Sequence, residues 1–185
     1  IIPGATSSMY VCINDEHGEM VSAVAAMDIL EGITPEFISS RIAMLNSCDA
    51  VVLDACLPTD TIAYILDNCT VPIFADSVSP AKSHRLFNAL SPTRSIHTLK
   101  MNRAEAQEVI RKEITESADM DAVAEALHQK GVKRVFITLG DQGCYYHDAD
   151  GGIHLPCEKV AVVNTCGAGD AFLAGAALAF LKRLD

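Results

Sequence analysis

The chain has 185 residues, of which 50% are hydrophobic and 21% are charged, so it has enough apolar side chains for one buried core. Its formal net charge of −10 argues against nucleic acid or an anionic membrane as a partner. The seven cysteines form no CxxC pair and the six histidines no HExxH motif. This pattern predicts free thiols in a reducing compartment such as the cytoplasm and gives no sign of a transition-metal site.

The N-terminal part, residues 5–28, has the pattern of a β-hairpin. Two apolar runs, Met9–Ile13 and Met20–Val24, flank a polar turn at Asp15–Glu19 that contains a glycine. The chain opens at Ile1 without Met and stops within an apolar helical pattern at Asp185. We therefore expect residues 1–185 to be a single incomplete domain.

Residues 35–185 alternate between helix and strand patterns. Thr34 and Pro35 are typical of an N-cap and a first helical position, and predict a helix through Phe37–Leu45. Strands are predicted at Ala50–Leu53, Val71–Ala75, Ser95–Leu99, Val135–Leu139, Cys144–Tyr146, Ile153–Leu155 and Lys159–Val163. Further helices are predicted after Leu57, from Asn102, over Asp119–Gln129 and over Gly167–Leu184. The alternation predicts an α/β fold with a mainly parallel sheet covered on both faces, whose ligands bind beyond the carboxyl ends of the strands.

The segment Asn164–Phe172 is the one most indicative of chemistry. Gly167, Ala168 and Gly169 precede a long apolar helix, so their N–H groups and the helix dipole predict an anion hole. Asp170 follows at once, where a carboxylate can accept the proton of a hydroxyl that attacks a phosphate. Close helix packing and a dipole-stabilising acid would explain the same residues. The position after a strand and at the start of a helix favours the functional interpretation.

Other polar residues at predicted strand ends have two interpretations. Asn102 and Glu105 have the spacing of a helix capping box, which is compatible with a role near Mg²⁺-bound water. Asp76 and Lys82 have the pattern of a solvated loop pair, which is favoured slightly over a phosphate contact for Lys82. Cys166 precedes a helix, but no histidine lies nearby in the sequence to act as a base, so a structural thiol is expected.

Four ordered motifs together resemble the ribokinase-like carbohydrate kinases, the phosphofructokinase B family. They are the Asn164–Phe172 signature, the Asn-x-x-Glu motif at Asn102–Glu105, the Thr-Leu-Gly-x-x-Gly loop at Thr138–Gly143 and the opening hairpin. The resemblance implies a ribokinase-like fold with residues 5–28 as a β lid and residues 35–185 as the nucleotide-binding core. It also implies ATP-dependent phosphorylation of a hydroxyl, with Asp170 as the base and the Gly167, Ala168 and Gly169 amides as the anion hole.

The same resemblance assigns the remaining site residues. It implies that Asn102, Glu105, Thr138, Gly140, Gly143 and Gly169 contact ATP, and that Glu105 helps to hold Mg²⁺ through water. Lids of this family sometimes pair between subunits, and the exposed hairpin edge leaves a homodimer through the lid open.

Within the family, the likeness is strongest to members that phosphorylate the 5′-hydroxyl of pseudouridine. It rests on Thr6–Tyr10 and Asp15–Met20 in the lid, on Val71–Lys82 and Ile96–Lys100 in the core, and on Asn164. An Asn in place of the Asp of ribokinase at position 164 weakens a monovalent-cation site, so potassium is not carried over. Met101 and Ser77 stand where these members usually have Pro.

Two alternatives stay open on the sequence alone. One is another ribokinase-type kinase that acts on ribose, another sugar or an adenosine-like nucleoside. The other is a catalytically silent α/β nucleotide-binding domain. A dinucleotide-binding fold is disfavoured because the glycines come late in the chain and Asp170 follows them directly.

Overall fold

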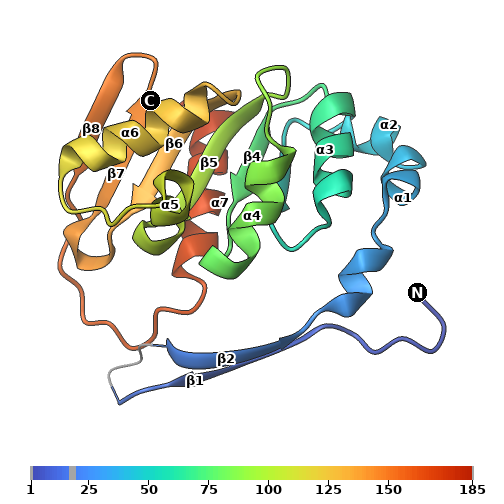
Figure 1. Ribbon diagram of the computed structural model, residues 1–185, viewed down its shortest axis with the longest axis horizontal. Coiled ribbons are helices and arrows are strands. Elements are labelled where there is room, and N and C mark those ends of the chain that lie inside the picture. The colour runs from blue at the N-terminus through green and yellow to red at the C-terminus, as the bar shows by residue number, and fades with distance from the viewer. Residues whose placement is uncertain (1, 17–19, 185) are drawn as a thin grey trace.

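The computed structural model describes residues 2–16 and 20–184. A six-stranded sheet with the order β3-β4-β5-β6-β7-β8 forms its centre, and a separate β1-β2 hairpin projects from it (Figure 1). The strands are β3 Val51–Asp54, β4 Ile73–Asp76, β5 Ile96–Asn102, β6 Val132–Thr138, β7 Cys144–Asp148 and β8 Gly151–Leu155. β3 to β6 run parallel, whereas β7 and β8 are antiparallel. The predicted mainly parallel α/β fold is confirmed.

The predicted N-terminal hairpin is also present. β1 (Met9–Asn14) pairs antiparallel with β2 (Met20–Ala26), with Met9 opposite Ala26. Of the predicted turn, residues 17–19 lie outside the described part of the chain. Figure 1 shows the hairpin lying apart from the central sheet, at the end where the parallel strands finish.

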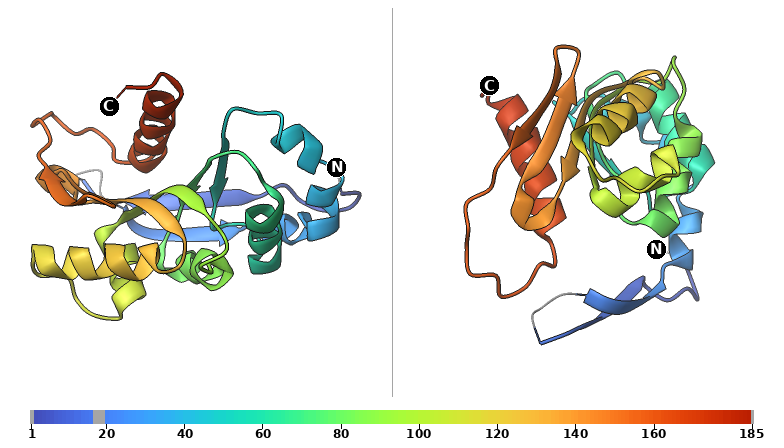
Figure 2. Two further views of the ribbon diagram at one scale, coloured as in Figure 1. Left: turned by 90° about the horizontal axis from the view of Figure 1, so that it is seen from above. Right: turned by 60° about the vertical axis from the view of Figure 1, so that its left-hand side comes forward.

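The helices divide unequally between the two faces of the sheet. On one face lie α3 Thr59–Asn68, α4 Pro80–Ala89, α5 Arg103–Ile110 and α6 Ser117–His128, and on the other lies α7 Ala168–Leu181 (Figure 2). α3 buries Ile62, Ile65 and Leu66, the three residues that its apolar spacing predicts on one face. The larger core lies under these four helices, and a smaller one lies where Leu173 and Ala177 of α7 meet Phe74. The described residues also form the 3₁₀ helices η1 Asp28–Gly32 and η2 Gly140–Gln142.

The predicted helix over residues 37–45 is broken into α1 Pro35–Ser39 and α2 Ile42–Leu45. Its start is as predicted, because the Thr34 hydroxyl accepts a hydrogen bond from the Phe37 N–H at 3.3 Å. The Ser40 hydroxyl and the Arg41 guanidinium both donate to the Phe37 carbonyl, at 2.8 and 3.1 Å. These side chains compete for the carbonyl that would accept the next helical bond, and the Arg41 N–H bonds to Ile38 instead.

Two further predictions need correction at the C-terminal end. Residues 159–163, predicted as a strand, are an irregular segment in which Val160, Val162 and Val163 are exposed. Their apolar pattern suits a strand, but no described strand lies beside them to accept the backbone hydrogen bonds. The last helix starts at Ala168 and ends at Leu181, so it is shorter than the predicted Gly167–Leu184. In the described part of the chain, no helix has the length and apolarity that crossing a membrane requires.

Candidate active site

The carboxyl ends of the parallel strands bring polar side chains into two short rows. Strand register aligns Asp54 of β3 with Asp76 of β4, and Asp76 with Lys100 of β5. Two residues further along β5, Asn102 aligns with Thr138 of β6. Side chains alternate between the faces of a sheet, so the first row shares one face. Residues of this row line a cavity together with Gly169 and Asp170 of α7, which places them on the α7 face.

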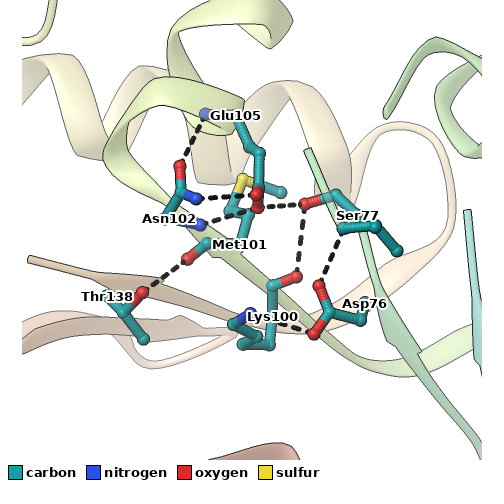
Figure 3. A network of polar contacts seen from close by, with 8 residues as sticks. Asp76, Ser77, Lys100, Met101, Asn102, Glu105 and Thr138 are labelled. Carbon is teal, nitrogen blue, oxygen red and sulfur yellow. Dashed lines mark hydrogen bonds and ion pairs between the residues drawn. The ribbon is translucent and has the colours of Figure 1, made fainter. Parts of the chain in front are cut away.

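A buried ion pair lies in the first row. The Lys100 Nζ donates to Asp76 Oδ2 at 2.9 Å, and the two residues are only 6% and 7% exposed (Figure 3). The other oxygen of Asp76 accepts a hydrogen bond from the Val78 N–H at 2.8 Å. The predicted solvated pair of Asp76 with Lys82 is therefore wrong. Lys82 Nζ lies instead 3.0 Å from the sulfur of Met27 and 3.4 Å from that of Cys56.

The predicted capping box at Asn102 and Glu105 is confirmed. The Asn102 side-chain oxygen accepts from the Glu105 N–H at 2.9 Å, and Glu105 Oε2 accepts from the Asn102 N–H at 2.9 Å. Glu105 Oε2 also accepts from the Ser77 hydroxyl at 2.6 Å, and Oε1 accepts from the Asn102 side-chain amide at 2.7 Å (Figure 3). Glu105 is 1% exposed, so these bonds hold its carboxylate in one orientation.

The same bonds limit what Glu105 can offer a metal ion. A carboxylate has about four lone-pair sites, and the three bonds to Glu105 leave one on Oε1. One spare site suits a single contact to metal-bound water. Because Mg²⁺ keeps several waters and binds mainly to substrate phosphates, Asn102 and Glu105 fit such an ion. In the described part of the chain, no group of three or more His, Cys, Asp or Glu residues is arranged to hold a metal by itself.

The start of α7 presents free backbone donors beside Asp170. The Ala168 N–H donates to the Thr165 carbonyl at 3.1 Å, whereas no described residue accepts from the Gly169 or Asp170 N–H. The two glycines serve different needs. Gly167 has a φ of 79°, which favours glycine, and a Cβ on Gly169 would come within 2.5 Å of Lys100 Nζ. Asp170 lies exposed in the first turn of the helix.

Two adjoining cavities collect the predicted site residues. A cavity of about 360 Å³ is lined by Thr138, Gly140 and Gly143 together with mostly apolar residues. A second cavity of about 590 Å³ is lined by Asn102, Glu105 and Asp170. Thr165 and Gly169 line both, so the Thr138–Gly143 loop and Asp170 lie on either side of the start of α7.

Three residues that line the larger cavity have no site role in the sequence motifs: Lys100, which pairs with Asp76, and Tyr10 and Cys12 of the hairpin. Lys100 interrupts an otherwise apolar run between Leu99 and Met101, and a charge in a buried strand indicates a buried partner. Nothing local in the sequence indicates that the hairpin reaches the start of α7. Cys12 lines this cavity together with Cys166 and Gly167, and hydrogen bonding with the Cys166 thiol raises the pKa of the Cys12 thiol.

Comparison with known proteins identifies the family. The profile of pfkB family carbohydrate kinases matches residues 1–185. A pseudouridine kinase of Escherichia coli K12 is 36% identical over 180 residues, which cover 96% of this chain and 56% of that protein. A ribokinase of Staphylococcus aureus is 26% identical over 181 residues, which cover 97% of this chain and 57% of that protein.

Solved structures agree on the fold. The crystal structure of a ribokinase from Thermotoga maritima superposes with a TM-score of 0.72 at 22% identity, over 94% of this chain and 56% of that one. The chain thus spans about half the length of the proteins it matches. With the match over its whole length and this arrangement of strand ends, glycines and Asp170, the chain belongs to the pfkB family of carbohydrate kinases.

Proposed function

We propose that the protein transfers the γ-phosphate of ATP to a hydroxyl of a small sugar or nucleoside. The observation that carries this proposal is the start of α7. Its free Gly169 and Asp170 amides and the Asp170 carboxylate line one cavity, next to the cavity of the Thr138–Gly143 loop. A helix N-terminus attracts the charge that develops on a phosphoryl group, and a carboxylate beside it can take a proton.

The nucleotide is expected to extend across both cavities. The apolar lining of the smaller one suits the flat base of ATP, next to Thr138, Gly140 and Gly143. The phosphates then pass Gly169, where Lys100 Nζ occupies the space that a side chain would take. This path brings the γ-phosphate into the larger cavity, which Asp170 and the hairpin residues line.

Asn102 and Glu105 would hold Mg²⁺, chiefly through water at the spare Glu105 Oε1 site. When bound, the ion offsets the negative charge of the phosphates. Ser77 positions Glu105 for that role, because its buried hydroxyl donates a hydrogen bond to Glu105 Oε2 and so fixes the carboxylate. A proline at position 77, as the sequence resemblance leads one to expect, would have no hydroxyl to donate this bond.

Asp170 accepts the proton of the attacking hydroxyl in the proposed reaction. The Gly169 and Asp170 amides hold the phosphoryl oxygens, whereas the Ala168 amide is already bonded to Thr165. The sequence resemblance assigned the Ala168 amide to the anion hole. In this proposal Ala168 instead helps to form the first turn of α7. Tyr10 and Cys12 line the same cavity, which supports a role of the hairpin as a lid that excludes water from the reaction.

We propose pseudouridine as the acceptor, phosphorylated on its 5′-hydroxyl. The 36% identity to a pseudouridine kinase supports this choice. The Asn at position 164, where ribokinase has Asp, supports it as well. Its side-chain oxygen accepts from the Cys166 N–H at 2.7 Å and so stabilises the turn before the glycines. The neutral amide also lacks the negative charge of the Asp that it replaces, which argues against a monovalent-cation requirement. A cytoplasmic location is part of the proposal, in keeping with seven cysteines that are all free thiols.

The test is ATP-dependent phosphorylation by the full-length protein of pseudouridine, uridine, ribose and adenosine side by side. We expect the highest kcat/KM with pseudouridine, and the same rate with and without K⁺. Ribose or adenosine as a far better acceptor would refute the choice of substrate but not the kinase. No phosphorylation of any acceptor would favour a catalytically silent nucleotide-binding domain.

A further inference from the structure

We propose that Lys100 is a catalytic residue whose ammonium contacts the phosphoryl group during transfer, and that Asp76 holds it in position. This inference rests on the proposed kinase function and deepens it. The sequence resemblance assigned no role to either residue. Figure 3 shows the pair at the ends of β4 and β5, below the Asn102–Glu105 capping box.

The first support is the contact between Lys100 and the start of α7. A Cβ built on Gly169 would lie 2.5 Å from Lys100 Nζ and 3.3 Å from its Cε. The ammonium therefore packs directly against the backbone whose free amides form the proposed anion hole. Placing a cation beside the positive end of a helix is unfavourable by itself. An anion in the cavity that contacts both the ammonium and the helix start offsets that repulsion.

The second support is an incomplete set of hydrogen bonds. A lysine ammonium has three N–H donors. One of them bonds to Asp76 Oδ2, and no other described residue accepts from Lys100. Lys100 is 6% exposed, yet it lines the 590 Å³ cavity together with Asp170. Two donors of a buried cation thus remain for a ligand in that cavity.

The position of Asp76 is itself fixed at a structural cost. Its Oδ1 accepts from the Val78 N–H, and Val78 adopts a φ of 66°, a left-handed conformation that is rare for a β-branched residue. Such backbone strain concentrates at functional sites. Buried ion pairs also add little stability over well-packed apolar residues. Neither feature is explained by stability, whereas both hold the ammonium at one point beside Gly169.

In the proposed step, the acceptor oxygen forms a bond to the γ-phosphorus while the bond from that phosphorus to the ADP oxygen breaks. The hydroxyl proton passes to Asp170, and ADP leaves with the electron pair of the broken bond. Lys100 keeps its proton throughout. Its two spare donors bond to the oxygens of the transferring group, together with the Gly169 amide.

The experiment compares Lys100→Met, Asp76→Asn, the double variant Asp76→Asn/Lys100→Met and Lys100→Arg in the full-length protein. Losing one preorganised donor costs on the order of 10²–10³ in kcat, and we expect that loss in Lys100→Met. The Mg²⁺-dependent affinity for ATP should fall roughly tenfold, as for the loss of one charge-assisted bond, while that for ADP stays unchanged. Lys100→Arg should retain part of the rate because it keeps the charge.

The double variant separates catalysis from structure. If Lys100 only neutralises Asp76, removing both charges restores the rate. If Lys100 contacts the phosphoryl group, the double variant stays as slow as Lys100→Met, although its stability to urea recovers. A restored rate, or an ATP affinity that Lys100→Met leaves unchanged, overturns the inference. A wild-type protein that phosphorylates no acceptor refutes the proposed function instead, and the difference between ATP and ADP binding still tests the Lys100 contact.

Discussion

One face of the central sheet is packed by α3, α4, α5 and α6, whereas among the described residues α7 alone lies across the other (Figure 2). Residues such as Leu86, Val123 and Leu127 are at most 1% exposed under the four helices. On the α7 face the core reduces to Phe74, Leu173 and Ala177, and Val52 of β3 is 60% exposed. Packing is thus concentrated on one face, and the candidate site lies on the other.

The difference between the two faces follows from the alternation of side chains along the strands. Ala75 and Leu99 point into the larger core, whereas the next residues, Asp76 and Lys100, point to the α7 face and form the ion pair. Alternation along a strand therefore separates an apolar side that stabilises the sheet from a polar side that serves the site. Substitutions on the two faces should have different consequences, for activity on one and for stability on the other.

The largest expected effect follows from Asp170→Asn on the α7 face. Asparagine keeps the size of the side chain but cannot accept a proton, so kcat should fall by about 10²–10⁴. Asp170 is exposed, so stability should change little, and ATP affinity should stay near that of the wild type. Steady-state kinetics, isothermal titration with ATP and urea unfolding measure the three quantities. Near-normal turnover would show that Asp170 acts only on the helix dipole.

The opposite result is expected from Leu86→Ala on α4. Leu86 is 0% exposed, and truncating a fully buried leucine costs about 2–5 kcal/mol of the free energy of unfolding. The matched control is Leu178→Ala on α7, where the side chain is 51% exposed and the change should stay within about 0.5 kcal/mol. Urea unfolding of both variants checks the difference. Equal losses would mean that α7 packs as tightly as the other helices.

The sequence predicted this architecture where local chemistry decides it. Thr34 and Asn102 act as helix N-caps as their types and spacing indicate, and the apolar runs at β3 to β6 form the parallel strands. The prediction failed for residues 159–163, because strand formation depends on a neighbouring strand that no local pattern reveals. The break between α1 and α2 arises because the Ser40 and Arg41 side chains both donate to the Phe37 carbonyl. Apolar periodicity does not predict such side-chain bonds either.

The candidate site was predictable only in part, for a related reason. Asn102, Glu105, Gly169 and Asp170 belong to short motifs, so their sequence spacing already indicates their chemistry. The pairing of Asp76 with Lys100 spans 24 positions and depends on the register of β4 and β5. The predicted partner of Asp76 was wrong because Lys82 is nearer to Asp76 along the chain, whereas Lys100 is nearer in space.

A titration on the four-helix face tests its stability further. Hydrogen bonding from the Lys112 ammonium, together with the Thr115 and Glu116 N–H groups, holds the pKa of Asp119 well below its usual range. The unfolded value is about 3.9 and the folded value is lower, so the stabilisation is complete above about pH 5 and is lost as pH falls further. Asp119→Asn should therefore be less stable than the wild type at neutral pH by an amount that shrinks in acid. Urea unfolding across that pH range measures it, and a difference that does not shrink would contradict it.

The smallest expected effect concerns His97, which joins α7 to the sheet. Its ring contacts those of Phe74 and Phe180, with centroid distances of 5.0 and 4.4 Å. Burial, and to a lesser degree the positive charges of Arg134 and Lys133, lower the pKa of His97. The unfolded chain, with a histidine pKa of about 6.5, then binds the proton more readily than the folded protein. Stability from the neutral ring is present above that pH and is lost as pH falls below it.

His97→Leu removes this titration while it keeps an apolar side chain against Phe180. The free energy of unfolding of the wild type should therefore decline relative to that of the variant as the pH falls from about 7.5 to about 5.5. Titration of the His97 ring protons by NMR should give a pKa below about 6.5, and resonances of α7 should broaden over the same range. If the His97 pKa is at or above that value, the ring is not buried by Phe180, and the contact that holds α7 to its face must lie at Leu173 and Ala177 instead.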